Sequence, residues 1–302
     1  MTGASRHRIL LTGKNGQVGW ELQRTLAPLG EVVALDRQQL DLVKPDQIRE
    51  RVREIKPSLI VNAAAYTAVD KAEEEPELAM AINGIAPGIL AEEAKRLNAA
   101  IVHYSTDYVF DGTKTTPYTE EDLPNPLNVY GRTKLEGERA IQAAGVPYMI
   151  LRTSWVYGMR GKNFLLTVLR LAQEREELRV VDDQIGAPTW SRMIAEATAQ
   201  ILAQVYLPVI SYSSPLTEKK GIYHLSAGGQ TSWYGFARAI VAQISETSTQ
   251  SVKLIPIPTS KYPAPARRPA YSLLSKAKLN GAFGLAMLDW DRALELVLDE
   301  CT

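Results

Sequence analysis

The sequence predicts an α/β protein, with a doubly wound parallel sheet followed by a smaller C-terminal lobe. Three observations support this class. Over the first 155 residues, short apolar runs alternate with longer amphipathic segments, as in strands connected by helices. A glycine-rich turn follows the first apolar run. After Trp155 the alternation loosens, and a length of 302 residues leaves room for a second unit.

The expected strands are short and apolar, and most are followed by a segment with helical spacing. Pro45 suits the first turn of a helix, where its missing amide hydrogen is not needed. We expect strands at Arg8–Leu11, Glu31–Leu35, Ser58–Asn62, Ala99–Tyr104 and Val146–Leu151, and helices at Val18–Leu29, Pro45–Ile55, Pro76–Leu97 and Asn128–Ala144. Such units place helices on both faces of a parallel sheet, with right-handed crossovers.

The C-terminal half is less regular. We expect helices at Phe164–Glu174, Arg192–Ala203 and Asp291–Asp299, a surface loop at Tyr206–Lys220, and a strand at Gly221–Ala227 that returns to the sheet. The five prolines of Pro256–Pro269 exclude a regular helix there. The expected division is a sheet domain over residues 1–155, with a returning segment near 221–250, and a lobe made mostly from residues 156–302.

The composition excludes several classes of partner. Lys+Arg and Asp+Glu number 34 each, so the chain has no excess of positive charge for nucleic acid or anionic lipid. Cys301 is the only cysteine, and the three histidines lie far apart in sequence, which excludes an intrachain disulfide and a short-spaced metal motif. No apolar run reaches the roughly 18–20 residues of a membrane helix, and Met1–Arg8 precedes no signal-peptide core. We expect a cytoplasmic protein.

A glycine-rich turn from Thr12 to Gly19 connects the first expected strand to the first expected helix. Its G-x-x-G-x-x-G spacing lets the backbone approach a phosphate, and the helix N-terminus offers unpaired N–H donors. Asp36 ends the second expected strand, where a carboxylate can bind the hydroxyls of an adenosine ribose. Alternatively, the glycines could form a strand–helix turn that binds no ligand, and Asp36 could be an ordinary turn residue. Together the two features predict a Rossmann-type dinucleotide site.

Tyr130 and Lys134 form a Y-x-x-x-K pair on one face of an expected helix. A nearby ammonium favours phenolate, so Lys134 would lower the pKa of Tyr130 and suit it to proton donation near neutral pH. This short motif is also common by chance. Ser105 and Thr106 close the fourth expected strand, at the sheet edge where α/β proteins bind ligands. Their hydroxyls could bind a substrate carbonyl or only cap a turn.

Several longer motifs accompany these features. They read TGKNGQVGWEL from Thr12, NAAAYTAVDKAE from Asn62, STDYVFDG from Ser105, YGRTK from Tyr130, RTSWVY from Arg152, DQIGAPT from Asp183 and YHL from Tyr223. In combination they resemble the extended short-chain dehydrogenase/reductases, over essentially residues 7–300.

The resemblance implies a reductase that uses NADPH or NADH. The implied reaction reduces the C4 keto group of dTDP-4-dehydro-L-rhamnose to give dTDP-L-rhamnose, a precursor of cell-surface polysaccharide. Residues 1–155 would bind the dinucleotide, and the lobe from residue 156 would bind most of the substrate. The alternatives are another nucleotide-sugar 4-ketoreductase or epimerase, and a non-catalytic cofactor-binding regulatory subunit. The intact Thr106, Tyr130 and Lys134 favour an enzyme.

The resemblance also implies roles for single residues. Tyr130 would protonate the C4 oxygen, Lys134 would tune that tyrosine and hold the nicotinamide ribose, and Thr106 would bind the reacting oxygen. The cofactor would also contact Gly13, Asn15, Gly16, Gln17, Val18, Asp36, Arg37, Asp41, Leu42, Ala63, Ala64, Ala65 and Tyr66. The sugar would contact Thr106, Asp107 and Trp155, although Trp155 could instead be a core residue. Further candidates for the nucleotide end are Asn163, Gln184, Arg267 and Arg268.

Two positions depart from relatives. Some relatives have a magnesium ion and acidic residues at a homodimer interface, but Arg192 stands where one of those acids is expected, which disfavours that ion and that dimer. Tyr66 replaces a histidine, a change of little consequence where the backbone makes the contact. For cofactor choice, Asp36 favours NADH and Arg37 favours NADPH, so we expect use of both, with a preference below roughly tenfold.

Overall fold

The computed structural model describes residues 7–206, 215–245 and 252–299. Its larger unit contains a six-stranded parallel sheet with the order β10-β5-β4-β3-β1-β2. The strands are β1 (Arg8–Thr12), β2 (Glu31–Leu35), β3 (Leu59–Asn62), β4 (Ala100–Thr106), β5 (Tyr148–Thr153) and β10 (Gly221–His224). The predicted α/β class is therefore confirmed. Because β1 lies between β2 and β3, the strand order reverses beside it, and open α/β sheets bind ligands at such a point.

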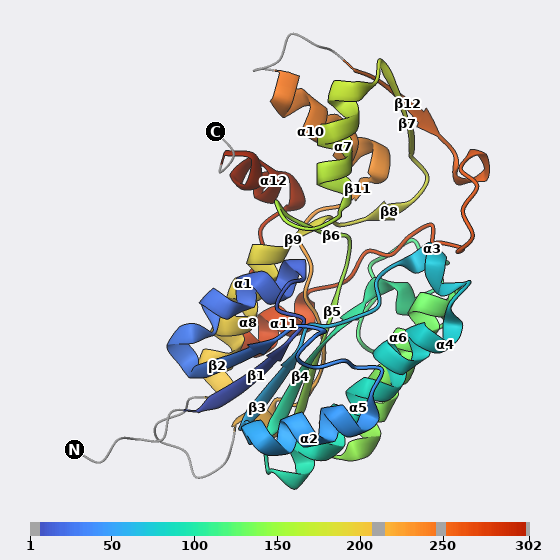
Figure 1. Cartoon of the computed structure of the whole chain (residues 1–302). Helices are drawn as coiled ribbons and strands as arrows, with labels where there is room; N and C mark the ends of the chain where they lie inside the picture. The colour runs from blue at the N-terminus through green and yellow to red at the C-terminus, as the bar shows by residue number, and fades with distance from the viewer. Residues whose placement is uncertain (1–6, 207–214, 246–251, 300–302) are drawn as a thin grey trace.

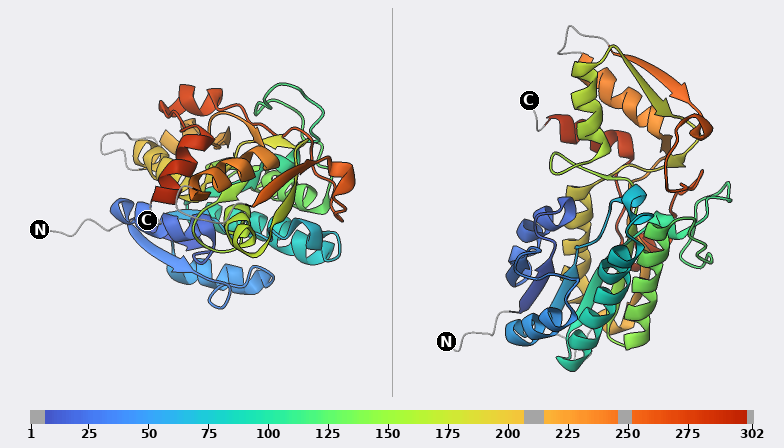
Figure 2. Two further views of the ribbon diagram at one scale, coloured as in Figure 1. Left: turned by 90° about the horizontal axis from the view of Figure 1, so that it is seen from above. Right: turned by 45° about the vertical axis from the view of Figure 1, so that its right-hand side comes forward.

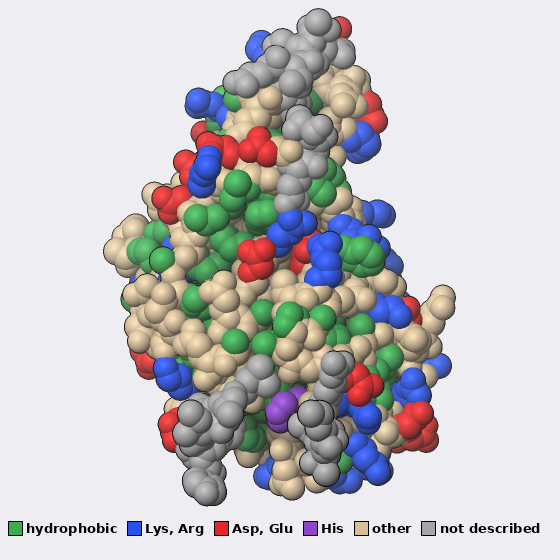
Figure 3. Space-filling view, turned by 90° about the vertical axis from the view of Figure 1, so that its left-hand side faces the viewer, with side chains coloured by type: hydrophobic (Ala, Val, Ile, Leu, Met, Phe, Trp, Pro, Cys, Tyr) green, Lys and Arg blue, Asp and Glu red, His purple; other side chains and the backbone are tan. Residues whose placement is uncertain are grey.

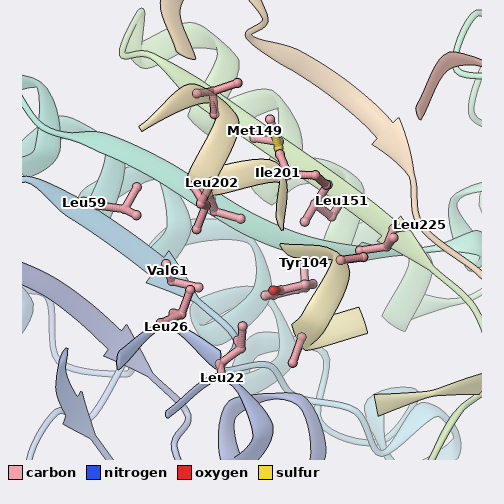
Figure 4. Close-up of a cluster of buried hydrophobic side chains, with 14 of the residues drawn as sticks. Leu22, Leu26, Leu59, Val61, Tyr104, Met149, Leu151, Ile201, Leu202 and Leu225 are labelled. Carbon is pink, nitrogen blue, oxygen red and sulfur yellow. The ribbon is translucent and has the colours of Figure 1, made fainter. Parts of the chain in front are cut away.

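Helices cover both faces of this sheet (Figure 1). On one face lie α1 (Gln17–Thr25), α8 (Ser191–Val205) and α11 (Ala277–Phe283), and on the other α2 (Pro45–Ile55), α5 (Ala86–Arg96) and α6 (Val129–Ala144). Figure 4 shows the apolar core between the sheet and α1, α8 and α11, where Leu22 and Leu26 of α1 face Val61 of β3. Burial on both faces explains why these strands are continuously apolar rather than alternating.

Two of the expected helices differ from the structure. The segment expected as one helix at Pro76–Leu97 consists of α4 (Pro76–Met80), a π-helical turn η2 (Ala81–Ile85) and α5. This wider turn carries Asn83, whose side chain bonds both the loop after β3 and α6. The helix expected at Val18–Leu29 ends as α1 at Thr25, and a 3₁₀ turn η1 (Ala27–Leu29) follows, because a proline occupies its centre.

The smaller lobe packs α7 (Phe164–Glu174), α10 (Trp233–Ser245) and α12 (Trp290–Asp299) around its own apolar core. The parallel pair β7 (Glu177–Val181) and β12 (Lys253–Ile257) borders it. Figure 2 (right) shows this lobe above one end of the large sheet. Short strands lie between the two units: β6 (Val156–Tyr157), β8 (Ile185–Gly186), β9 (Thr189–Trp190) and β11 (Thr231–Ser232).

The irregular segments were only partly predicted. The loop expected at Tyr206–Lys220 includes a short helix α9 (Pro215–Glu218), while residues 207–214 lie outside the described part of the chain, as does Cys301. The proline-rich stretch has no α-helix; it begins within β12 and continues through a 3₁₀ turn η4 (Thr259–Lys261). The sequence did not predict α3 (Val69–Ala72), α10, α11, β7 or β12.

The surface carries charges of both signs. On the face seen in Figure 3, acidic and basic side chains are interspersed, in keeping with the zero net charge. Among the described residues, no helix combines the length and the apolar character needed to cross a membrane.

Candidate active site

The glycine-rich turn lies at the carboxyl end of β1 and leads directly into α1. Gly13 has a φ of +73°, and a Cβ there would lie 2.7 Å from the backbone nitrogen of Ala64. A Cβ on Gly19 would lie 2.1 Å from the carbonyl oxygen of Gly13. Side chains are therefore excluded at both positions. Gly16 precedes α1 without a side-chain cap, so the first amides of the helix suit a pyrophosphate.

Asp36 lies at the end of β2, as predicted, but it has a partner that the sequence did not suggest. Its carboxylate lies 3.2 Å from the Lys14 ammonium and accepts hydrogen bonds from the amides of Gln38 and Gln39. Partial desolvation raises the pKa of Asp36, but Lys14 and these amides outweigh it, so the pKa is lowered. Arg37 is 74% exposed and pairs with Asp41 at 3.8 Å. A phosphate here would meet two cations, Lys14 and Arg37.

The predicted contacts after Asp36 and after β3 differ in accessibility. The side chain of Leu42 is buried in the core beside α2. Ala63, Ala64 and Ala65 are partly exposed, and the amide of Ala64 bonds the hydroxyl of Thr12. The side chain of Tyr66 donates to Glu75, while its backbone is held by Asn83 on the π-helical turn. The side chain and the backbone of Tyr66 thus both have partners within the chain.

Thr106, Asp107 and Tyr130 meet at the carboxyl end of β4. The hydroxyl of Thr106 donates to Asp107 at 3.1 Å and accepts from the amide of Tyr108 at 3.1 Å, and Tyr130 lies close by, its ring edge-on to that of Tyr108 with 5.9 Å between centroids. Burial raises the pKa of Asp107 to about 7, against hydrogen bonds from Ser272 and Thr106. Burial likewise raises the pKa of Tyr130 to about 12, which the Thr106 hydroxyl opposes. The lowering expected from Lys134 is therefore not found, and Tyr130 keeps its proton at neutral pH.

The start of α6 explains why Tyr130 reaches Thr106. Asn128 caps the helix by accepting from the amide of Gly131 at 2.8 Å, and Glu73 accepts from the amide of Val129. A Cβ on Gly131 would lie 2.2 Å from the carbonyl oxygen of Tyr108. The glycine beside Tyr130 therefore permits the close approach of α6 to the segment after β4.

Lys134 lies one turn further along α6 and is 1% exposed. Its ammonium donates to the carbonyl of Tyr104 and lies 3.2 Å from Nε2 of His103. Burial lowers the pKa of Lys134 to about 8, and the charge of Glu138 opposes the shift. Tyr130 and Lys134 therefore lie at neighbouring turns of α6, but the hydrogen bonds of the lysine go to His103 and Tyr104 of β4.

Trp155 lies where the chain leaves β5 for the smaller lobe. It has a φ of +46°, an uncommon value for a bulky residue. Its indole stacks on Trp233 of α10 with 3.6 Å between ring centroids and 5° between planes. On the same ring, a Cβ on Gly186 would lie 2.6 Å from Cε2. Trp155 is only partly buried, so it joins the two units rather than filling either core.

A cavity of about 730 Å³ opens in the smaller lobe beside this stack. Its lining includes Trp233, Gln184, Arg179, Tyr262 and Arg268. Gln184 is nearly buried and accepts a hydrogen bond from the Trp233 indole at 3.2 Å. Arg268 is not a solvated surface charge, because it forms a two-point ion pair with Asp70 of α3 at 2.7 and 3.0 Å. This pair links the lobe to the sheet domain.

The remaining candidates have structural partners. Asn163 caps α7 and donates to the side chain of Gln17 on the cofactor turn at 2.9 Å. The side chain of Arg267 is exposed, while its carbonyl accepts from Asn128. Arg192 on α8 pairs with Glu21 of α1 at 3.4 Å. Among the described residues, no three His, Cys, Asp or Glu side chains are grouped to hold a metal ion.

Sequence reasoning missed several residues of this site. Lys14 lies within the glycine motif, where only the glycines carried the inference. Trp233 and Asn83 belong to no recognised motif and lie far from the site in sequence. His103 precedes the STDY motif by two positions, but only the pairing of strands shows that it faces Asn62 and Lys134.

Comparisons with known proteins agree with this geometry. The family described as RmlD substrate binding domain matches residues 7–302. A dTDP-4-dehydrorhamnose reductase of Burkholderia thailandensis is 50% identical over 293 residues, 96% of this chain and 97% of the relative. The enzyme of that name from Escherichia coli K12 is 46% identical over 298 residues, 97% of each chain. The crystal structure of a Bacillus anthracis dTDP-4-dehydrorhamnose reductase with NADP gives a TM-score of 0.89 at 36% identity, covering 98% of this chain and 99% of that one.

Proposed function

The chain belongs to the RmlD family, and from this premise we propose that it reduces dTDP-4-dehydro-L-rhamnose to dTDP-L-rhamnose with NADPH or NADH. The membership confirms the resemblance read from the sequence motifs. The observation that carries the residue assignment is the grouping of Thr106, Asp107 and Tyr130 at the carboxyl end of β4, on the sheet edge that also bears the glycine-rich turn.

The residues fit a nicotinamide dinucleotide. Gly13, Gly16 and the first amides of α1 suit the pyrophosphate, Lys14, Asp36 and Arg37 suit the adenosine end, and Lys134 suits the nicotinamide ribose. When bound, the reduced nicotinamide supplies a hydride to the C4 carbon of the sugar.

Tyr130 completes the reduction. As the hydride adds to carbon, the C4=O π electrons move onto oxygen, and the phenol O–H gives that oxygen its proton. The raised pKa keeps this proton on Tyr130 until it is needed. Thr106, whose hydroxyl lies at the same strand end, would hold the same oxygen by a hydrogen bond. The products are the C4 alcohol and the phenolate of Tyr130, which must take a proton from solvent before the next turnover.

We assign the sugar and its nucleotide to the smaller lobe. Trp155 and Asp107 border the sugar, and the cavity lined by Gln184, Trp233 and Arg268 suits a nucleoside diphosphate. An arginine fork is well matched to diphosphate oxygens, which at Arg268 would share the guanidinium with Asp70. The reaction consumes reduced nicotinamide cofactor, which supports a cytoplasmic location. We propose a homodimer that does not use the acidic interface of some relatives, since Arg192 replaces one of its acids, and sedimentation of the purified chain tests it.

The decisive experiment is steady-state turnover with enzymatically prepared dTDP-4-dehydro-L-rhamnose. We expect loss of reduced-cofactor absorbance and formation of dTDP-L-rhamnose, identified by its sugar proton spectrum. Formation of a C4 epimer without net cofactor oxidation would identify an epimerase instead. Cofactor binding without turnover of any 4-keto sugar nucleotide would identify a regulatory subunit.

A further inference from the structure

A row of buried polar side chains crosses the sheet beneath the glycine-rich turn. The strand register places Thr12 of β1 opposite Asn62 of β3, and Asn62 opposite His103 of β4. The hydroxyl of Thr12 lies 2.6 Å from Oδ1 of Asn62, and Nδ2 of Asn62 lies 3.0 Å from Nδ1 of His103. The three side chains are at most 2% exposed. Polar groups at such depth are costly unless each donor has an acceptor.

The row ends on Lys134. Nε2 of His103 lies 3.2 Å from its Nζ, and the carbonyl of Tyr104 accepts a second bond from the same group. The nearest carboxylate along α6, Glu138, is held by Arg152 of β5 through bonds of 2.9 and 2.7 Å. The side-chain partner of this buried lysine is therefore an imidazole rather than a carboxylate.

Two hydrogen-bond arrangements connect Asn62, His103 and Lys134. A charged Lys134 has only donors, so Nε2 must accept, the ring hydrogen lies on Nδ1, and Asn62 must turn its amide oxygen toward the ring. Its Nδ2 then faces Thr12, whose oxygen accepts in place of donating. In the second arrangement Nδ2 of Asn62 donates to Nδ1, as the structure has it, and the ring hydrogen lies on Nε2. That hydrogen then needs the lone pair of a neutral Lys134. The two states therefore differ by a half turn of the Asn62 amide and by which ring nitrogen of His103 carries the hydrogen.

We propose that His103 is a positioning residue for Lys134, and that its tautomer, held by Asn62 and Thr12, changes with the charge of that lysine. The proposal rests on the function proposed above for its effect on the reaction, but not for the tautomer itself. His103 does not contact the reacting atoms. It holds the ammonium beside the carbonyl of Tyr104, where the proposed function has Lys134 bind the cofactor ribose, without adding a negative charge.

The charges around Lys134 agree with this proposal. Burial first, and then the nearby Lys134, lower the pKa of His103 well below its usual range, so the ring stays neutral. The titratable groups that face Lys134 are His103 from β4 and Glu138 from its own helix, the latter neutralised by Arg152. With the pKa of Lys134 lowered to about 8, its charge changes within an accessible range of pH.

The direct test is nitrogen NMR of the ¹⁵N-histidine-labelled protein without cofactor. The His103 signals are assigned by their loss in His103→Gln. We expect the Nδ1–H tautomer at pH 6 and a change to Nε2–H with a midpoint near the pKa of Lys134. In Lys134→Met the change with pH should vanish. A doubly protonated ring at pH 6, or one tautomer throughout in the wild type, would overturn the proposal.

Two variants separate a specific role from a general loss of packing. Glutamine places its terminal amide near the position of Nε2, whereas asparagine reaches only the position of Nδ1. We expect His103→Gln to keep NADPH affinity and the pH profile of kcat close to wild type. His103→Asn should weaken NADPH binding and lower kcat by on the order of ten- to a hundredfold, with the sugar KM little changed.

Equal behaviour of the two variants would reduce His103 to a packing role. The NADPH titration and the spectra do not depend on the substrate. Absence of turnover in the wild type with an intact tautomer change would therefore contradict the proposed function alone.

Discussion

The sheet domain and the smaller lobe build their parts of the site by different means. In the sheet domain, functional side chains follow the carboxyl ends of parallel strands, and the register fixes their neighbours: Thr12, Asn62 and His103 lie side by side because β1, β3 and β4 do. In the smaller lobe, Trp155, Gln184 and Arg268 come from three irregular segments held by one stack, one hydrogen bond and one ion pair. We infer that the sheet domain positions the side chains that take part in the reaction, and that the lobe positions the substrate.

The largest expected effect tests the chemistry of the sheet domain. Tyr130→Phe keeps the ring that packs on Tyr108 but removes the proton donor. Loss of a general acid typically costs about 10²–10⁴-fold in rate, so kcat should fall by that factor. Fluorescence titration should give nearly unchanged NADPH affinity. Turnover at the wild-type rate would mean that another group protonates the sugar.

A second prediction tests the lobe through its aromatic stack. Trp155→Ala should raise the sugar KM much more than the NADPH KM, because the proposed function places Trp155 beside the sugar and away from the dinucleotide. Since the ring is partly buried, its removal should also lower the free energy of unfolding by about 3 kcal/mol, the low end for buried aromatics. Calorimetry and substrate titration measure the two effects.

Trp233→Ala and the double variant complete a cycle for this stack. A coupling of about 0.5–1.5 kcal/mol is expected for a stacked pair. A lower free energy of unfolding with unchanged substrate affinity in Trp155→Ala would show that this residue has a purely structural role. It would also weaken the inference that the lobe positions the substrate.

A smaller effect is expected where the two regions are tied together. Arg268→Lys keeps the charge but loses the planar fork that pairs with Asp70. We expect the sugar KM to rise by roughly tenfold, about 1.4 kcal/mol, with kcat less affected. Arg267→Lys, at the exposed neighbour, is the matched control and should change neither constant. Equal effects of the two variants would exclude Arg268 from substrate binding.

The smallest effect concerns cofactor choice at the edge of the sheet domain. We expect NADH and NADPH to be used with a preference below about tenfold, because Asp36 favours a free ribose while Lys14 and Arg37 favour a 2′-phosphate. Arg37→Ala and Lys14→Ala should each raise the KM for NADPH more than that for NADH, and Asp36→Ala should harm NADH more. An equal change for both cofactors in Arg37→Ala would show that this exposed arginine does not bind the phosphate.

The same contrast explains what could be predicted from the sequence. The glycine turn, Asp36 and the Tyr130–Lys134 pair were found because their residues are close in sequence and their geometry follows from one strand–helix unit. The contacts of Trp155 with Trp233 and of Asp70 with Arg268 join residues far apart in the chain, and no local sequence pattern predicts them. Burial also reversed one expectation: the pKa of Tyr130 depends more on desolvation than on the lysine one turn away.

The indole stack has a consequence for how the molecule can be observed. Two parallel indoles at 3.6 Å share their excited states, so their absorption and emission differ from those of isolated tryptophans. One ring belongs to the segment after β5 and the other to α10, and the signal therefore depends on how the two units are placed. The protein thus contains an intrinsic optical reporter between its two halves, readable in solution without a label while substrate and cofactor bind.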